Sequence, residues 1–461
     1  MKDLTQGSIV SHIVQMAGVM VIGMVGQTLY YLVDLYFVSG LGPQAIAGVG
    51  AAGNITFVVL ALTQILNVGT AALISHAAGR KDQNDANVVF NQSITLSALV
   101  GVFVLVAGYL LTRPYLNAVG ADEGTRQAGV TYLYWFMPGL ALQFAMVSMG
   151  AGLRGTGIVR PTMTVQVLTV LLNVALAPVL IAGWGTGHAF GVAGAGLAST
   201  IAIVAAVAML TWYFERLEKY VAFHREQWRP RLEYWKRILN IGLPAGGEFF
   251  LMFILMGLMY WLIRDFGSQA QAGYGIGSRV TQAIFLPAMA VAFSAAPVAG
   301  QNFGARHGER VRSTFRTAVL LETAIMAVIL VLCQIAPASL IAAFTREPQV
   351  IAVGTDYLRI ISWNFIGSGI IFTCSGMFQA MGNTWPALSS GVSRLVIFGI
   401  PAVWLSQQPG FTLRQVWVTS VVAVLLQTVI SFVLVRIEMR KRLTFAPVTA
   451  VNPVASALPV D

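Results

Sequence analysis

The chain has 461 residues, of which 57% are apolar and only 10% are charged. Soluble domains are about 45–50% apolar and about 25% charged, so this composition excludes an ordinary soluble domain and indicates a membrane protein with several spans. The formal net charge of +10 does not point to nucleic acid, because basic residues in membrane proteins mark the cytoplasmic loops.

Twelve apolar stretches of about 20 residues or more are separated by polar or Gly/Pro-containing loops. They predict an all-α polytopic membrane protein embedded in a lipid bilayer. Several stretches are longer than a bilayer requires, so tilted or bent helices are expected. The predicted helices lie near 9–38, 44–76, 87–112, 124–152, 159–183, 191–215, 237–264, 270–300, 311–335, 350–380, 384–406 and 411–436.

The basic residues predict the orientation of these spans. With the N-terminus in the cytoplasm, 20 of the 28 Lys and Arg residues fall in inner loops and 6 in outer loops. Such a bias is typical of the cytoplasmic side. We therefore expect both termini to face the cytoplasm and the protein to lie in the cytoplasmic (inner) membrane.

The sequence resembles itself at a constant offset of 225 residues. "GLGPQAIAGVGAAGNI" at 40–55 lies over "DFGSQAQAGYGIGSRV" at 265–280, and Gly79 and Gly157 meet Gly304 and Gly382 with no gap. Six helices per repeat leave both halves in the same orientation, so the repeat is parallel, about an axis along the membrane normal. Transporters built from repeats carry the substrate site between their halves.

This repeat predicts the domain organisation. Residues 1–215 form an N-lobe of six helices, 216–236 a charged cytoplasmic connector, and 237–442 a C-lobe of six helices. The tail 443–461 is rich in Pro, Ala and Val without helical periodicity, and is expected to be disordered.

Asp34 is the acidic residue of the apolar stretch "QTLYYLVDLYFVSGLG". A charged side chain at the centre of a membrane helix costs about 2.5–3.5 kcal/mol on insertion scales, and such residues are usually functional. Gln27, Tyr30 and Tyr31 share a helical stripe with Asp34, whereas the repeat places Met259 at the equivalent position. Asp34 is therefore predicted to carry a proton in one conformation and release it in another. The alternative is a permanent structural contact with Tyr or Asn.

Three polar residues of the fifth and sixth predicted helices can complete a pocket with Asp34. Asn173 lies in "LLNVALAPVL", and Ser199 and Thr200 lie in "GAGLASTIA". Each residue alone also fits a simple contact between helices.

Four further polar residues lie in the second half. Pro244 is expected to break or kink its helix, which would place Glu248 near the helix start and near the cytoplasmic interface. Arg279, Glu322 and Arg394 lie within spans, and since buried charges pair, a structural ion-pair network is expected.

No residue pattern indicates catalysis, a metal or a cofactor. The five His residues lack metal-ligand spacing, and no GxxxxGK[ST] phosphate loop occurs. A membrane-embedded enzyme, which requires a nucleophile with a nearby base or a metal site, is therefore the less favoured interpretation. Cys333 and Cys374 lie in apolar segments and are expected to be core residues.

Several motifs of this sequence resemble those of the multidrug and toxic compound extrusion (MATE) transporters, most of all those of the DinF-like branch. The resemblance rests on "QTLYYLVDLYFVSGLGPQAIAGVG", "GAGLRGTGIVRPTM", "LLNVALAPVL", "GVAGAGLAST", "GLP" and "FQAMGNTWP", and covers about residues 8–440. It implies a V-shaped pair of lobes that export small amphipathic, often cationic compounds, driven by inward H⁺ or Na⁺ flow. It also implies that Asp34 is the protonated acid, with Gln27, Tyr30, Asn173 and Ser199 as its neighbours. A monomer is expected.

Two positions depart from the family pattern. Ala177 stands where many relatives have a second acid, which favours H⁺ over Na⁺ because cation coordination gains from several oxygens. Val19 stands where many relatives have a proline, although nearby glycines still permit bending. A lipid-linked precursor flippase of the same superfamily and a major-facilitator transporter, which also has parallel six-helix halves, remain alternatives.

Overall fold

The structure, a computed structural model, describes residues 1–120 and 122–445. Within the first helix it does not describe the side chains of Gln27, Tyr30, Tyr31, Leu32, Asp34 and Leu35. The regular elements of the described chain are all helices, and twelve segments are long and apolar enough to cross a membrane. The predicted fold class is therefore confirmed. The tail predicted to be disordered covers 443–461, and its residues from 446 onward lie outside the described part of the chain.

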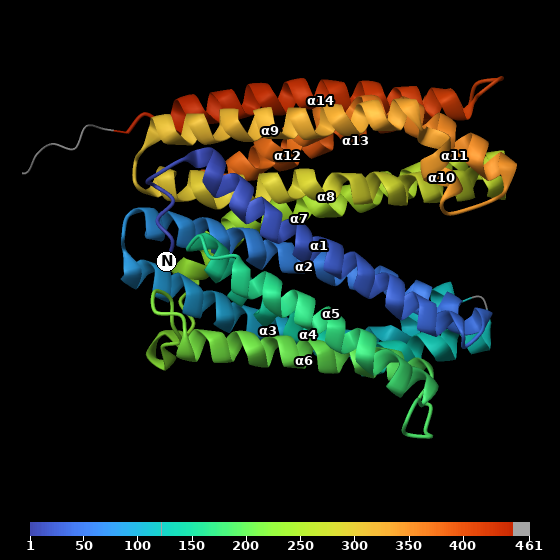
Figure 1. The fold of residues 1–461 in the computed structure, drawn as a ribbon, viewed down its shortest axis with the longest axis horizontal. Helices are drawn as coiled ribbons and strands as arrows, with labels where there is room; N and C mark the ends of the chain where they lie inside the picture. Colours follow the sequence, from blue (N-terminus) through green and yellow to red (C-terminus); the bar gives the residue numbers. More distant parts are fainter. Residues whose placement is uncertain (121, 446–461) are drawn as a thin grey trace, which may run out of the picture.

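The first half contributes six long helices (Figure 1). Helix α4 packs against α2, α3 and α6, and α5 packs against α1 and α6, so their shared faces form one apolar core. The helices are α1 (Ile9–Ser39), α2 (Pro43–Gly79), α3 (Gln83–Val119), α4 (Glu123–Gly155), α5 (Arg160–Ala182) and α6 (Val192–Arg216).

The second half repeats this arrangement with more interruptions. Helix α8 packs against α9, α11 and α12, and α14 packs against α12 and α13. The elements are α7 (Leu232–Ile263), α8 (Ser268–Gly304), α9 (Gly308–Ile335), α10 (Pro337–Ala342), α11 (Pro348–Ile361), α12 (Phe365–Ala380), α13 (Trp385–Ser406) and α14 (Leu413–Arg442), with the short 3₁₀ segments η2 (Arg264–Phe266) and η3 (Ser362–Asn364).

One predicted helix and the expected effect of one proline differ from the structure. The helix expected over 350–380 is interrupted by η3, where Gln334 of α9 donates to the Arg359 carbonyl at 2.8 Å and to the Ser362 hydroxyl at 2.7 Å. A side chain that binds a helix carbonyl favours such an interruption. Helix α7, in contrast, continues through Pro244, and the Thr384 hydroxyl donates to the Ile241 carbonyl at 2.5 Å in the preceding turn. A break at Pro244, one of the two expected effects, is therefore absent, and the helix predicted over 237–264 is confirmed.

The charged connector between the halves is bound to α3. It contains η1 (Arg225–Trp228). Asn91 accepts from the His224 amide and the Trp228 indole, both at 2.9 Å. Asn87 accepts from Ala222, and Gln92 accepts from Arg231, both at 2.8 Å. These side-chain amides hydrogen-bond to polar groups of a connector that is mostly outside regular secondary structure. They thereby fix the connector to the first half.

The N-terminal segment, the connector and the end of α14 lie at one end of the bundle, which we call the basic end (Figure 1). Three hydrogen bonds to backbone carbonyls define this end. The Lys2 amide donates to Thr156, the Gln83 side chain to Tyr220, and the Arg442 side chain to Met381. The turns after α2 and α8 also lie here, and they have the same geometry: Lys81 and Arg306, which the 225-residue offset aligns, have φ of 59° and 60°. The two halves diverge toward the opposite end in Figure 1.

Candidate transport site

Helix α1 carries the predicted acid. Gln27, Tyr30, Tyr31 and Asp34 all lie within α1, so the predicted helical spacing is confirmed for the backbone. Their side chains lie outside the described residues, and the predicted contacts of Asp34 stay a prediction.

Asn173 is a strong candidate for a partner of α1. Helix α5 packs against α1, and Asn173 is wholly buried with neither its amide nitrogen nor its carbonyl oxygen hydrogen-bonded to any described group. A buried amide without partners is costly, by about 1–3 kcal/mol. The residue thus has free hydrogen-bonding capacity deep in the N-lobe. Ala177, one turn further along, is also wholly buried.

The two neighbouring hydroxyl groups of α6 differ in their surroundings. Ser199 is buried. The Thr200 hydroxyl donates to the Trp135 carbonyl of α4 at 2.6 Å, and Gly139 leaves room for it. Thr200 therefore joins two helices, as in the simpler of the two predicted interpretations.

Glu248 lines a small, mainly apolar pocket in the C-lobe. It lies near the middle of α7, not near a helix start, which corrects the prediction from Pro244. The Ser375 hydroxyl donates to its carboxylate at 2.7 Å. The rest of the lining is mainly aromatic and thioether side chains: Phe249, Met252, Met289, Phe293 and Phe372.

The predicted ion-pair network is absent from the part of the chain that the structure describes. No salt bridge there joins Arg279, Glu322 or Arg394 to one another or to any other residue. Arg279 is exposed, and Arg394 lies near the phenol groups of Tyr274 and Tyr357. The network was therefore a wrong prediction, because the three side chains face different neighbours.

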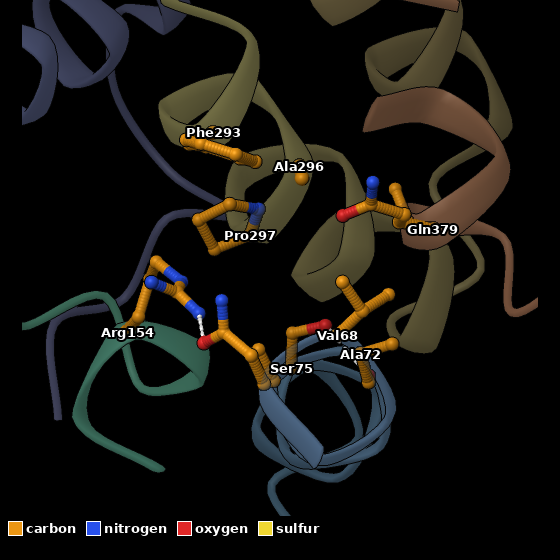
Figure 2. A pocket seen from close by; sticks show the side chains of 11 residues that line it. Val68, Ala72, Ser75, Arg154, Phe293, Ala296, Pro297 and Gln379 are labelled. Carbon is orange, nitrogen blue, oxygen red and sulfur yellow. Dashed lines mark hydrogen bonds between the residues drawn. The ribbon is translucent and has the colours of Figure 1, made fainter. Parts of the chain in front are cut away.

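A second small pocket lies where the two halves meet (Figure 2). Figure 2 shows Val68 and Ala72 of α2 opposite Phe293 and Pro297 of α8, and the 225-residue offset aligns these residues pair by pair. The offset also aligns Arg154 of α4 with Gln379 of α12, which line the same pocket. The pocket therefore lies on the axis that relates the two lobes. Arg154 donates to the Asn67 side chain within the N-lobe.

Two hydrogen bonds related by the same axis join the lobes at the basic end. The His76 ring nitrogen Nε2 bonds to the Ala380 carbonyl at 2.6 Å, and the Gln301 amide donates to the Gly155 carbonyl at 3.1 Å. The offset aligns His76 with Gln301 and Gly155 with Ala380. We call this pair of hydrogen bonds the lobe latch.

Two glycines beside the lobe latch let the backbones cross. A Cβ atom on Gly79 would lie 2.0 Å from the Gln301 carbonyl oxygen, and one on Gly304 would lie 2.2 Å from the His76 carbonyl oxygen. Real Cβ atoms do not approach that closely, so α2 and α8 can meet in this way only with glycine at both positions.

The N-terminal segment crosses the same junction. The Lys2 amide donates to Thr156 of the N-lobe at 2.9 Å, and the Leu4 amide donates to the Gln301 side chain of the C-lobe at 2.9 Å. Asp3 accepts from the Thr5 hydroxyl at 2.5 Å, and this hydrogen bond lowers the pKa of Asp3. The charged Asp3 thus stabilises the turn that spans both lobes at neutral pH.

The aligned glycines can be identified from the sequence, whereas the lobe latch could not be predicted from a side-chain pattern. His76 and Gln301 differ in residue type, and their partners are backbone carbonyls that no side-chain pattern reveals. The 225-residue offset, applied to every polar residue of α2 and α8, would have paired them.

Two parallel six-helix repeats, joined at one end and holding pockets between and within them, define a two-lobed membrane transporter. The sequence model of the MatE family matches residues 20–179 and 244–405. The chain belongs to the MATE family.

Relatives and solved structures agree with this assignment. The chain is 25% identical to the "Probable multidrug resistance protein YoeA" of Bacillus subtilis over 388 residues, 82% of each chain. It is 27% identical to the "Multidrug export protein MepA" of Staphylococcus aureus, covering 79% of this chain and 80% of the relative. A structure described as the outward-facing conformation of a multidrug resistance MATE family transporter superimposes with a TM-score of 0.89 at 25% identity, over 96% of this chain and 98% of the other.

Proposed function

We propose that the protein is a secondary active exporter of amphipathic, often cationic drugs or metabolites, driven by inward H⁺ flow. The observation that carries this proposal is the junction of the lobes at the basic end. The junction is closed by side-chain hydrogen bonds, the Asp85–Arg237 ion pair and close glycine crossings of α2 with α7 and α8. All of these are contacts between complete helices, so the junction can open without unfolding either lobe. A junction of this kind suits alternating access, in which two rigid repeats rock about a central site.

The basic end faces the cytoplasm in this proposal. It holds the connector and the basic loops, which the positive-inside rule assigns to the cytoplasmic side. Both termini are then cytoplasmic, in a multi-pass protein of the inner membrane that acts as a monomer. The conformation described above is the one closed toward the cytoplasm.

Asp34 is the protonation switch of the N-lobe in this account. Proton binding removes its charge, rearranges its contacts with Gln27, Tyr30 and Asn173, and displaces the substrate. Because position 177 is alanine, the N-lobe lacks there the second carboxylate that a Na⁺ site would use, so H⁺ is the favoured coupling ion. One charge moving through 100 mV supplies about 2.3 kcal/mol, enough for a concentration ratio of roughly 40 at about 1.4 kcal/mol per tenfold.

The Glu248 pocket is the substrate subsite that we assign to the C-lobe. Aromatic faces attract cations and methionine side chains adapt to many shapes, so this lining suits varied amphipathic cations near one carboxylate. Glu248→Gln should weaken binding of a cationic dye about tenfold, at about 1.4 kcal/mol, and leave a neutral amphipathic substrate unaffected. Fluorescence titration of both ligands checks this. Equal loss for the two ligands would contradict a charge-specific role.

The lobe latch gives a second prediction. His76→Ala should remove one of its two hydrogen bonds and leave the Ala380 carbonyl unpaired, at about 1–3 kcal/mol, which is roughly 5- to 150-fold in the equilibrium between closed and open basic ends. His76→Gln should keep the bond, because glutamine makes it at the aligned position 301. Spin labels at the exposed, aligned positions Lys81 and Arg306 report the distance across this end. An unchanged distance distribution in His76→Ala would exclude the latch.

Transport in sealed vesicles tests the proposed function. Everted membrane vesicles that contain the protein should accumulate a fluorescent organic cation when a pH gradient is imposed, and should not do so when a Na⁺ gradient alone is imposed. The accumulated compound should be chemically unchanged by mass spectrometry, as expected for a transporter and not an enzyme. Accumulation driven only by Na⁺ would overturn the assignment of the coupling ion.

A further inference from the structure

Glu322 is a further acid within the membrane spans, besides Asp34 and Glu248, and the proposed function gives it no role. It lies on α9, is wholly buried, and neither of its carboxylate oxygens has a hydrogen-bond partner. Since no salt bridge of the described chain includes it, no cation neutralises it. An ionised carboxylate in such surroundings is very costly, and a buried acid in this position instead binds a proton.

The seam between α9 and α12 is shaped to hold this side chain. A Cβ atom on Gly369 of α12 would lie 3.2 Å from the Glu322 Oε2 atom and 3.3 Å from Met326, so the glycine makes room for the carboxyl group. Thr373 lies one turn further along α12, is buried, and its hydroxyl is also without a partner. Two polar groups on facing helices are thus left unsatisfied in one apolar seam.

The repeat shows what this seam looks like without an acid. The 225-residue offset aligns Glu322 with Ser97 of α3 and Thr373 with Ser148 of α4. In the N-lobe the Ser97 and Ser148 hydroxyls are hydrogen-bonded to each other at 2.5 Å, and both are buried. Two hydroxyl groups therefore suffice to hold these helices together, and the carboxyl group at the C-lobe position exceeds what the scaffold requires.

We propose that Glu322, together with Thr373, is a proton-binding site of the C-lobe that is occupied in the conformation described here. A protonated carboxyl group gains one O–H donor, and the Thr373 hydroxyl, which has no other partner among the described groups, is the acceptor that we assign to it across the seam. The proton leaves when α9 and α12 separate enough for water to reach the site. The presence of a bound proton on Glu322 is inferred from the contacts between α9 and α12 alone. A role of this proton in coupled transport rests on the proposed function.

A proton fits this site better than a metal cation. Na⁺ requires several oxygen ligands. Among the described side chains, this seam offers a carboxyl group and one hydroxyl, beside the apolar Met326. The intramembrane acids of the two lobes therefore differ: Asp34 aligns with Met259, whereas Glu248 and Glu322 align with Gly23 and Ser97.

Infrared difference spectroscopy on reconstituted full-length protein tests occupancy directly. At neutral pH the wild type should show the carbonyl band of a buried protonated carboxylic acid, and Glu322→Gln should lack it. Asp34→Asn and Glu248→Gln should each retain it. A wild-type spectrum identical to that of Glu322→Gln would overturn the proposal, as would a band that disappears when Na⁺ is added at constant pH.

Transport assays then test coupling, with a matched pair of variants. Glu322→Gln keeps the shape of the side chain without a titratable group, and Glu322→Ser reproduces the hydroxyl pair of the N-lobe. Both should fold with wild-type thermal stability or better, and both should lose most of the dependence of transport rate on pH. A wild-type pH profile in both variants would exclude a coupling role. Should the wild type not respond to a pH gradient at all, the proposed function fails while the infrared result still decides occupancy.

Discussion

Gly79→Ala should largely abolish transport and shift the protein away from the conformation closed at the basic end. The added methyl group would lie 2.0 Å from the Gln301 carbonyl oxygen, which is backbone and cannot rotate away. Helices α2 and α8 would have to separate by about 1 Å, and overpacking of this kind costs about 1–3 kcal/mol. Because the lobe latch lies beside this contact, both of its hydrogen bonds should lengthen as well. Spin-label distances between positions 81 and 306 measure the separation.

A matched control lies on the same helix. A Cβ atom on Gly53 of α2 meets nothing within 4 Å, so Gly53→Ala should transport normally and gain slightly in helix stability. Gly304→Ala, at the aligned position of α8, should behave like Gly79→Ala. If Gly79→Ala and Gly53→Ala have the same distance distribution and the same activity, the close crossing of α2 and α8 has no role in closure.

Asp34→Asn should abolish coupled transport while substrate binding persists. The amide occupies nearly the volume of the carboxyl group, so packing and expression should be preserved, but it cannot bind and release a proton. Purified wild-type protein should therefore release protons when substrate is added, and the variant should release none. A pH electrode in weakly buffered solution, with binding followed in parallel by dye fluorescence, measures both quantities.

Asp34→Glu is the control for this prediction. It restores a titratable carboxyl group one methylene longer, so partial proton release should return. Substrate-dependent proton release in Asp34→Asn at the wild-type level would mean that another acid carries the coupling, and Glu322 would then be the first candidate.

The spans and the repeat could be predicted because bilayer thickness and symmetry constrain many residues at once. Apolar segments of sufficient length can be recognised without knowing their partners. The constant offset likewise links Gly79 to Gly304 without a structure, and it reappears in the equal backbone angles of Lys81 and Arg306. Such features depend on the chain itself and not on which helices become neighbours.

The polar contacts could not be predicted, because they depend on which helix faces which. Arg279, Glu322 and Arg394 share the second half, and the rule that buried charges pair led to a wrong network. In the structure Arg279 is exposed, Arg394 lies near two phenol groups, and Glu322 faces Gly369. Pro244 by itself predicts a break or a kink. In the structure the Thr384 hydroxyl, just before α13, donates to the Ile241 carbonyl and supports this turn of a continuous helix.

Antiport is reversible, so cation efflux down its own gradient should drive proton movement. This reversal is the most direct test of H⁺-coupled export through Asp34. Proteoliposomes loaded with an organic cation, with no pH gradient at the start and the membrane voltage clamped, should move protons in the opposite direction as the cation leaves. Proton movement should be proportional to cation efflux in the wild type and absent in Asp34→Asn. Cation efflux through the wild-type protein without any proton movement would contradict this coupling.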